Sequence, residues 1–135
     1  MPRIDIPPSA ASIASVRHAL ADDLERVGTG DSVADATLVL SELLSNAVRH
    51  AAPLAGNGLV VNWHVEDGAA MVVIAVTDGA TEAEPVVQQP SVAADSGRGL
   101  AIVDKLASAW GVRRSLHHKT VWARVPLRHR LAHLQ

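Results

Sequence analysis

The sequence predicts an α+β fold, a two-layer sandwich in which three helices cover one face of a mostly antiparallel sheet. Three observations predict it. Apolar residues recur at steps of three and four positions in three segments, as in amphipathic helices. In other segments they alternate with polar residues or form short continuous runs, as in strands. The order along the chain is strand, two helices, two strands, a long connection, a helix and two strands, which favours this architecture.

Length and composition indicate one globular domain without disulfides. The chain has 135 residues, of which 48% are hydrophobic, and contains three Trp but no Phe or Tyr, so aliphatic side chains must fill the core. A net charge of −2 gives no reason to expect nucleic-acid binding, and the absence of cysteine excludes thiolate metal sites. There is no signal-peptide pattern and no long apolar run. We expect a cytoplasmic protein with no membrane contact, a domain over residues 1–126 and a basic tail over residues 127–135.

The first elements are a short strand and a helix. Residues 3–6 alternate polar and apolar before two prolines, which predicts at most an edge strand. Ser9 or Ser12 can cap the helix that follows. Gly28 and Gly30 are expected to close it, and no strand precedes them, so a phosphate loop is not favoured there. The apolar face of this helix comprises Ile13, Val16, Leu20, Leu24 and Val27.

A second helix is centred on residues 38–50. Ser32 and Asp35 form a capping-box pattern, so the helix is expected to begin near Ser32. At about 100° per residue, Glu42 and Asn46 fall on the polar side as neighbours four positions apart. The apolar stripe comprises Val33, Ala36, Leu40, Leu43, Leu44, Ala47 and Ala51.

The pair Glu42 and Asn46 allows two interpretations. An amide oxygen can ligate Mg²⁺, and a neighbouring carboxylate can accept a proton or hold a metal-bound water, which suits phosphate chemistry. His50 lies one turn further on. Alternatively, this is an ordinary solvated helix face, which is the more common situation for such residues.

Two strands joined by a hairpin follow. Residues 59–65 alternate as in a half-buried strand, Asp67 and Gly68 carry the hairpin signal, and residues 71–76 form an apolar inner strand. Asp78 follows at the end of that strand. Its carboxylate could cap the turn, or it could accept a hydrogen bond from an exocyclic amine such as that of adenine.

The segment of residues 80–96 has no period and contains two prolines, so we expect a functional lid. A third helix is expected over residues 100–110, ended by Gly111, with Gly97-Arg98-Gly99 just before its first turn. Glycines before a helix let backbone amides approach a phosphate, although glycines are also common in loops. The apolar set of the helix is Leu100, Val103, Leu106, Ala107 and Trp110.

The chain closes with a hairpin, residues 112–116 and 119–125, turning at His117-His118. These adjacent histidines would point to opposite faces of a strand, and His129 and His133 have no third ligand nearby. A native zinc site is therefore not favoured. The nucleophile-elbow, Walker-A and zinc-protease motifs are absent.

Four ordered motifs resemble a known family. They are Glu42-Leu-Leu-Ser-Asn46-Ala-Val-Arg-His50, Val76-Thr-Asp78-Gly79, Ser96-Gly-Arg-Gly99-Leu-Ala-Ile-Val and Lys119-Thr-Val-Trp-Ala123. Together they closely resemble the ATPase domain of bacterial anti-sigma-factor serine kinases, and most of all the small stand-alone regulators of actinobacteria. That group belongs to the GHKL superfamily of Bergerat-type ATPases, shared with gyrase, histidine kinases and mismatch-repair ATPases. The resemblance covers residues 4–125.

The resemblance implies an ATP pocket between the helices and the sheet, with Mg²⁺. It implies Glu42 as general base, Asn46 as Mg²⁺ ligand, Asp78 as reader of the adenine amine, Gly97, Arg98, Gly99 and Leu100 as phosphate-binding backbone, Thr120 near the adenine, and His50 and Gly79 in the nucleotide site. It further implies a protein serine/threonine kinase that binds a sigma factor, phosphorylates a STAS-type anti-anti-sigma partner and forms a homodimer.

Two positions depart from the family pattern. In the family's first glycine box, Asp-x-Gly-x-Gly, Ala80 replaces the glycine two positions after the Asp, and His118 replaces a glycine before Lys119. The intact Glu42 and Asn46 favour the kinase, whereas the altered glycine box favours a second hypothesis, a regulator that binds a partner without phosphotransfer. A third, the catalytic domain of a histidine kinase, would need a phosphoacceptor helix for which the residues before the first helix leave no room.

Overall fold

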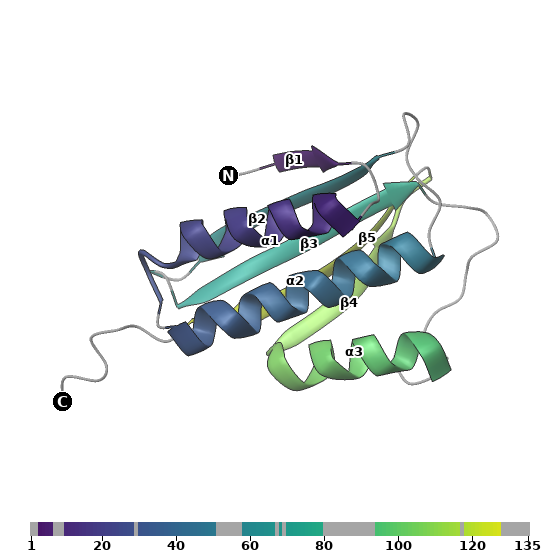
Figure 1. The fold of residues 1–135 in the computed structure, drawn as a ribbon. Coiled ribbons are helices and arrows are strands. Elements are labelled where there is room, and N and C mark those ends of the chain that lie inside the picture. The colour runs from purple at the N-terminus through teal and green to yellow at the C-terminus, as the bar shows by residue number, and fades with distance from the viewer. Residues whose placement is uncertain are drawn as a thin grey trace.

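The computed structural model describes residues 3–6, 10–28, 30–50, 58–66, 68, 70–79, 94–116 and 118–127 (Figure 1). In chain order the elements are β1 (Arg3–Ile6), α1 (Ala10–Leu24), α2 (Gly30–His50), β2 (Leu59–Glu66), β3 (Met71–Gly79), α3 (Ala94–Leu106), β4 (Ala109–Arg114) and β5 (His118–Pro126).

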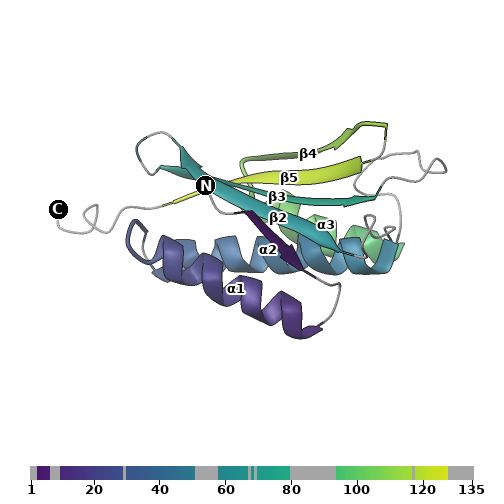
Figure 2. The same cartoon turned by 90° about the horizontal axis from the view of Figure 1, so that it is seen from above.

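The strands form one sheet in the order β1-β2-β3-β5-β4, and every neighbouring pair is antiparallel. The three helices lie together on one face of it (Figure 2). The predicted two-layer α+β sandwich is therefore confirmed. The expected edge strand, β1, is also present, paired with β2 at the border of the sheet.

Strand alternation decides which side chains meet the helices. On β3 the fully buried Val72, Ile74 and Val76 alternate with less buried residues. Because directly opposite residues of antiparallel strands share a face, Val61 of β2 and Val121 of β5, the partners of Val76, belong to the same buried row. This row forms the sheet's side of the core.

Helix α2 forms the centre of the helical layer, between α1 and α3 (Figure 1). Its buried apolar side chains follow the predicted helical period, with Val39 as an addition to the predicted stripe. They are Val33, Ala36, Val39, Leu40, Leu43, Leu44 and Ala47. A hydrogen bond also joins α1 to the sheet. The buried Trp63 of β2 donates its indole N–H to Asp23 Oδ2 of α1 at 2.8 Å.

Two helix boundaries differ from the predictions. Helix α2 begins at Gly30, not near Ser32, so Gly30 opens this helix and does not close the previous one. Helix α3 begins at Ala94 and ends at Leu106, so residues 97–99 lie inside it and not before it. Gly is a weak helix former but does not forbid a helix, at a cost of about 1 kcal/mol relative to Ala.

The expectation that Gly111 stops the third helix is wrong, because Trp110 and Gly111 belong to β4. A neighbouring side chain explains this glycine. Trp122, its partner on β5, covers it so closely that an added Cβ would lie 3.0 Å from the ring carbon Cζ2. Glycine permits this approach, so the residue serves sheet packing.

The remaining boundaries shift by a few residues. Strand β3 continues to Gly79, and the β2–β3 hairpin turns at Gly68, whose φ of 64° suits a glycine. The last turn is closed by Ser115 N–H donating to the carbonyl of His118 at 2.9 Å. Leu127 is buried and donates its N–H to Ala70, so it packs with the domain.

Several predicted features lie outside the described residues: Ser9, residues 80–93 of the lid expected over residues 80–96, His117 and residues 128–135. The last three residues of that expected lid, residues 94–96, form the start of α3. Within the described parts of the chain, no helix combines the length and apolar character that crossing a membrane requires.

Candidate functional site

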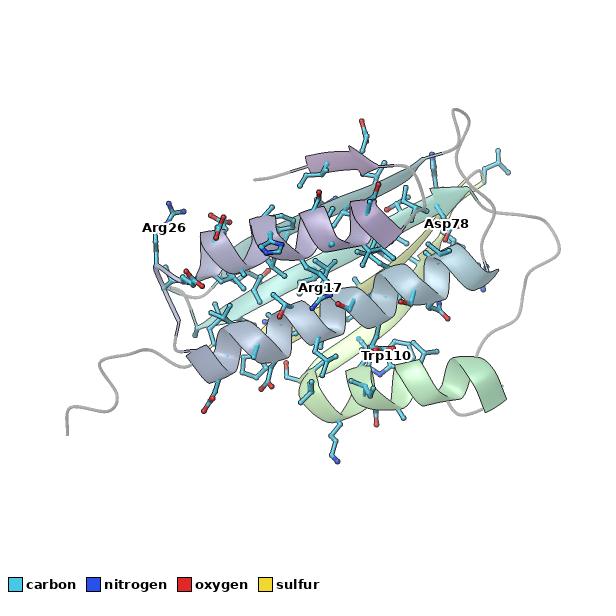
Figure 3. The ribbon with its side chains drawn as sticks, viewed as in Figure 1. Arg17, Arg26, Asp78 and Trp110 are labelled. Atoms are coloured by element: carbon cyan, nitrogen blue, oxygen red, sulfur yellow. The ribbon has the colours of Figure 1, made fainter. Side chains whose placement is uncertain are left out.

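Asp78 is the one buried ionisable side chain among the described residues. It is 1% exposed and continues the row of Val72, Ile74 and Val76, so it faces the helical layer at the end of β3 (Figure 3). Its Oδ1 atom is buried and accepts no hydrogen bond. A buried acceptor without a partner costs about 1–3 kcal/mol, so Oδ1 marks a place where a ligand's donor would be favoured.

Among the described side chains, Lys119 forms an ion pair with this acid. It lies directly opposite Asp78 on β5, and its Nζ is 4.0 Å from Asp78 Oδ2. Arg114 follows on β4, opposite Lys119. Burial raises the pKa of Asp78 from 3.8 to about 6, while the charges of Lys119 and then Arg114 lower it. The carboxylate is therefore mostly ionised at pH 7, despite its burial.

Glu42 and Asn46 are both half-buried, in the carboxyl-terminal half of α2. Helix α2 packs on β3. The carboxyl ends of α2 and β3 and the start of α3 lie at the same end of the molecule (Figures 1 and 2). The fold thus brings the helix that carries Glu42 and Asn46 to the strand that carries Asp78. His50 is the last residue of α2, and its side chain lies outside the described residues.

The glycine-rich segments occupy different structural positions. Gly79 is the last residue of β3 and lies opposite His118. Gly97 is the fourth residue of α3, at the end of its first turn. Arg98, Gly99 and Leu100 lie beyond that turn, so their N–H groups are placed for bonds within the helix. That Gly97, Arg98, Gly99 and Leu100 hold the phosphates through their backbone amides stays a prediction.

The side chain of Thr120 points away from that of Asp78. Residues 119 and 121 share the helix-facing side, so Thr120 points to the open face of the sheet. There its hydroxyl oxygen is 2.7 Å from that of Thr77. The Thr120 hydroxyl and the Asp78 carboxylate therefore lie on opposite faces of the sheet, although Thr120 is next in sequence to Lys119, the residue opposite Asp78.

Sequence reasoning missed Lys119 and Arg114 as members of the site. The signal was available in the alternation of the last strand. Val121 and Val125 are the apolar positions that must face the helices, and Lys119 shares their parity. What the sequence did not give is the register, which places Lys119 opposite Asp78.

The donor set fits magnesium held mainly by a nucleotide. Across the described ranges no three His, Cys, Asp or Glu side chains converge as a metal site. Mg²⁺ keeps several waters and is commonly held by one or two side chains together with substrate phosphates. An amide oxygen from Asn46 and a carboxylate from Glu42 on adjacent turns suit that mode.

The chain matches a known family of domains over most of its length. Residues 6–125 match the sequence profile of the family described as the histidine kinase-like ATPase domain. No curated protein matches the chain significantly.

Two solved structures have a similar fold. The RsbU and RsbW domains of Rv1364c from Mycobacterium tuberculosis match with a TM-score of 0.67 and 21% identity, over 94% of this chain and 33% of that chain. The histidine kinase domain of the blue-light activated kinase EL346 from Erythrobacter litoralis matches with a TM-score of 0.56 and 21% identity, over 90% of this chain and 62% of that one. The chain thus spans less than two thirds of either protein, and at this identity the likeness establishes the fold.

Proposed function

Because this chain belongs to the family of histidine kinase-like ATPase domains, we propose that it binds ATP together with Mg²⁺. The observation that carries the proposal is the buried Oδ1 of Asp78, which has no hydrogen-bond partner. The 6-amino group of adenine supplies the missing donor. Asn46 would hold the Mg²⁺, which would neutralise the charge of the phosphates.

The proposed biological role is partner switching. The chain sequesters a sigma factor and transfers the γ-phosphoryl group of ATP to a serine of a STAS-type anti-anti-sigma protein. Glu42 acts as the general base or as the group that orients the serine hydroxyl. The four ordered sequence motifs support this role, and an RsbW domain is among the proteins of similar fold. A cytoplasmic homodimer is part of the proposal.

A second candidate is a nucleotide-binding regulator that binds a partner protein without transferring a phosphoryl group to it. Two observations favour it. Ala80 replaces a glycine of the first glycine box. In addition, Arg98, Gly99 and Leu100 lie inside α3, so their amides become phosphate donors only if the first turns of that helix unwind.

Phosphotransfer to a cognate STAS protein separates the two candidates. We would measure label transfer from ATP and nucleotide affinity for wild type, Glu42→Ala, Asn46→Ala and Asp35→Ala. Asp35 is the matched control, a half-buried acid elsewhere on α2. General-base contributions are about 10²–10⁴-fold. Glu42→Ala should therefore lose transfer by at least about a hundredfold and keep ATP affinity within about tenfold.

Asn46→Ala should weaken Mg²⁺·ATP binding itself, and Asp35→Ala should resemble wild type in both measurements. Wild type that binds ATP yet labels no STAS protein would favour the regulator without phosphotransfer. Glu42→Ala that transfers phosphate at the wild-type rate would remove the catalytic role of Glu42.

A further inference from the structure

Burial is the largest influence on the ionisation of Asp78, and the charge of Lys119 is the strongest influence that opposes it. We propose that Lys119 is a positioning residue that holds Asp78 in the acceptor-only carboxylate form. It thereby makes the site select purines with a 6-amino group over purines with a 6-oxo group. The proposal rests on the proposed ATP site, and it assigns base selection to a residue that does not itself touch the base.

The surroundings of Asp78 are otherwise apolar. On the helix-facing side of the sheet its strand neighbours include Val76 and Val61, and α2 packs against β3 with buried aliphatic side chains. Among the described residues, the charged groups that act on the Asp78 carboxylate are Lys119 on β5 and, more weakly, Arg114 on β4. Removing the Lys119 charge therefore leaves the weaker effect of Arg114 to oppose burial.

The geometry lets Lys119 act by charge without occupying the binding atom. Its Nζ is 4.0 Å from Oδ2, beyond hydrogen-bond distance, while Oδ1 stays free. The Lys119 side chain is only 17% exposed, so solvent screens the interaction incompletely. The second oxygen of the carboxylate is thus available to a ligand.

Protonation changes what this oxygen can recognise. An ionised carboxylate only accepts hydrogen bonds, whereas a protonated one can also donate. A 6-amino purine offers a donor at the position read by Oδ1. A 6-oxo purine in the same pose offers an acceptor, so two acceptors would face each other in a buried place. Hydrogen bonds to charged groups are worth about 1.5–3 kcal/mol, so selection should be roughly ten- to hundredfold.

Burial works against this selection. It raises the pKa of Asp78 to about 6 even with Lys119 present. Without Lys119 the carboxyl group would keep its proton to a higher pH, because an opposite charge at this distance typically lowers a pKa by about 1–3 units. At neutral pH the neutral acid would then tolerate both types of purine.

The test compares ATP with inosine triphosphate, which carries the 6-oxo group. Affinities of both would be measured with Mg²⁺ between about pH 5.5 and 8.5 for wild type, Lys119→Met, Lys119→Arg and Arg113→Met. Arg113 is the matched control, an exposed cation on the opposite sheet face. Wild type should prefer ATP at pH 8 and lose preference as the pH falls through about 6.

In Lys119→Met the loss of preference should move upward by about one pH unit or more. Lys119→Arg should restore the wild-type profile, and Arg113→Met should leave it unchanged. Carboxyl ¹³C resonances of the nucleotide-free proteins give an independent reading, with the Asp78 midpoint higher in Lys119→Met. If Lys119 had only a structural role, Lys119→Met would weaken the binding of both nucleotides equally. It would then shift neither the pH at which the preference is lost nor the Asp78 titration midpoint.

The outcomes separate the two proposals. If wild type binds neither nucleotide, the proposed function and the selection both fail. If wild type binds ATP but Lys119→Met keeps the same nucleotide preference and the same Asp78 midpoint, the role of Lys119 alone is overturned.

Discussion

The hydroxyl oxygens of Thr77 and Thr120 lie 2.7 Å apart and join β3 to β5 on the sheet face that points away from Asp78. Thr120 therefore serves the sheet with its side chain, while Lys119 takes the position beside the acid. We predict that Thr120→Val lowers the free energy of unfolding by about 1 kcal/mol and changes ATP affinity by less than about threefold.

Thr77→Val should cost a similar amount, and the double variant should cost little more than either, because both remove the same bond. Chemical denaturation and nucleotide titration of the three proteins provide the measurement. If Thr120→Val loses ATP affinity without losing stability, the Thr120 hydroxyl contributes to nucleotide binding and not to the sheet.

A second prediction concerns the cost of burying Asp78. Its pKa of about 6 in the folded protein lies above the 3.8 of an unperturbed group, so the folded state binds the proton more tightly than the unfolded state. This contribution stabilises the fold at acid pH and is lost as the pH rises through about 6. Asp78→Asn should therefore raise the free energy of unfolding at pH 8 by up to about 3 kcal/mol.

Near pH 4 the same substitution should have little effect, because wild-type Asp78 is then largely protonated. Thermal unfolding at both pH values tests this difference, with Asp22→Asn as a control at an exposed acid. An Asp78→Asn protein that is less stable than wild type at pH 8 would show that the carboxylate contributes to the fold. Such a cost at a binding site is a known trade-off between stability and function.

The third prediction concerns magnesium. If Asn46 reaches the phosphates through the ion, ATP should bind only weakly in excess chelator, and Asn46→Ala should reduce the difference between the two conditions. Calorimetry with and without Mg²⁺ measures this for both proteins. Equal affinity of wild type under the two conditions would exclude the role of Asn46.

The fourth prediction concerns the contact between Gly111 and Trp122. A Cβ at residue 111 would meet ring atoms at 3.0–3.1 Å, so Gly111→Ala forces the indole to move. Overpacking of this kind typically costs about 1–3 kcal/mol. In a Trp122→Leu background the cost should largely vanish, which a double-mutant cycle would detect. If Gly111→Ala lowers the free energy of unfolding equally in both backgrounds, the cost comes from the backbone at residue 111 and not from contact with Trp122.

The sequence predicted the fold because local period and element order agree. The buried residues of α1 and α2 follow the predicted stripes, and the β2–β3 hairpin turns at the predicted Gly68. One difference lies at Gly30, which opens α2, and the others lie near α3 and β4. Gly97 and Gly99 are expected just before the third helix but lie inside it, and Gly111, expected to end that helix, lies in β4 beneath Trp122.

In the candidate site, too, local patterns indicate some features, whereas others depend on how the strands pair. The sequence predicted Asp78 by its place at the end of an inner strand. The alternation of the last strand already indicates that Thr120 points to the open face of the sheet. The proximity of Lys119 to Asp78 depends in addition on the register of β3 and β5, which involves residues about forty positions apart. Local patterns do not determine such pairing, because the alignment of the strands follows from the packing of the whole sheet.

Calorimetric titration of wild type and Asp78→Asn with Mg²⁺·ATP at pH 8 tests the central claim most directly. The substitution is nearly isosteric and is expected to leave the fold at least as stable. We predict that wild type binds ATP and that Asp78→Asn binds at least about tenfold more weakly, because the charge-assisted hydrogen bond to the 6-amino group is lost. Equal affinity of the two proteins for ATP would contradict the assignment of Asp78 as the group that reads the base.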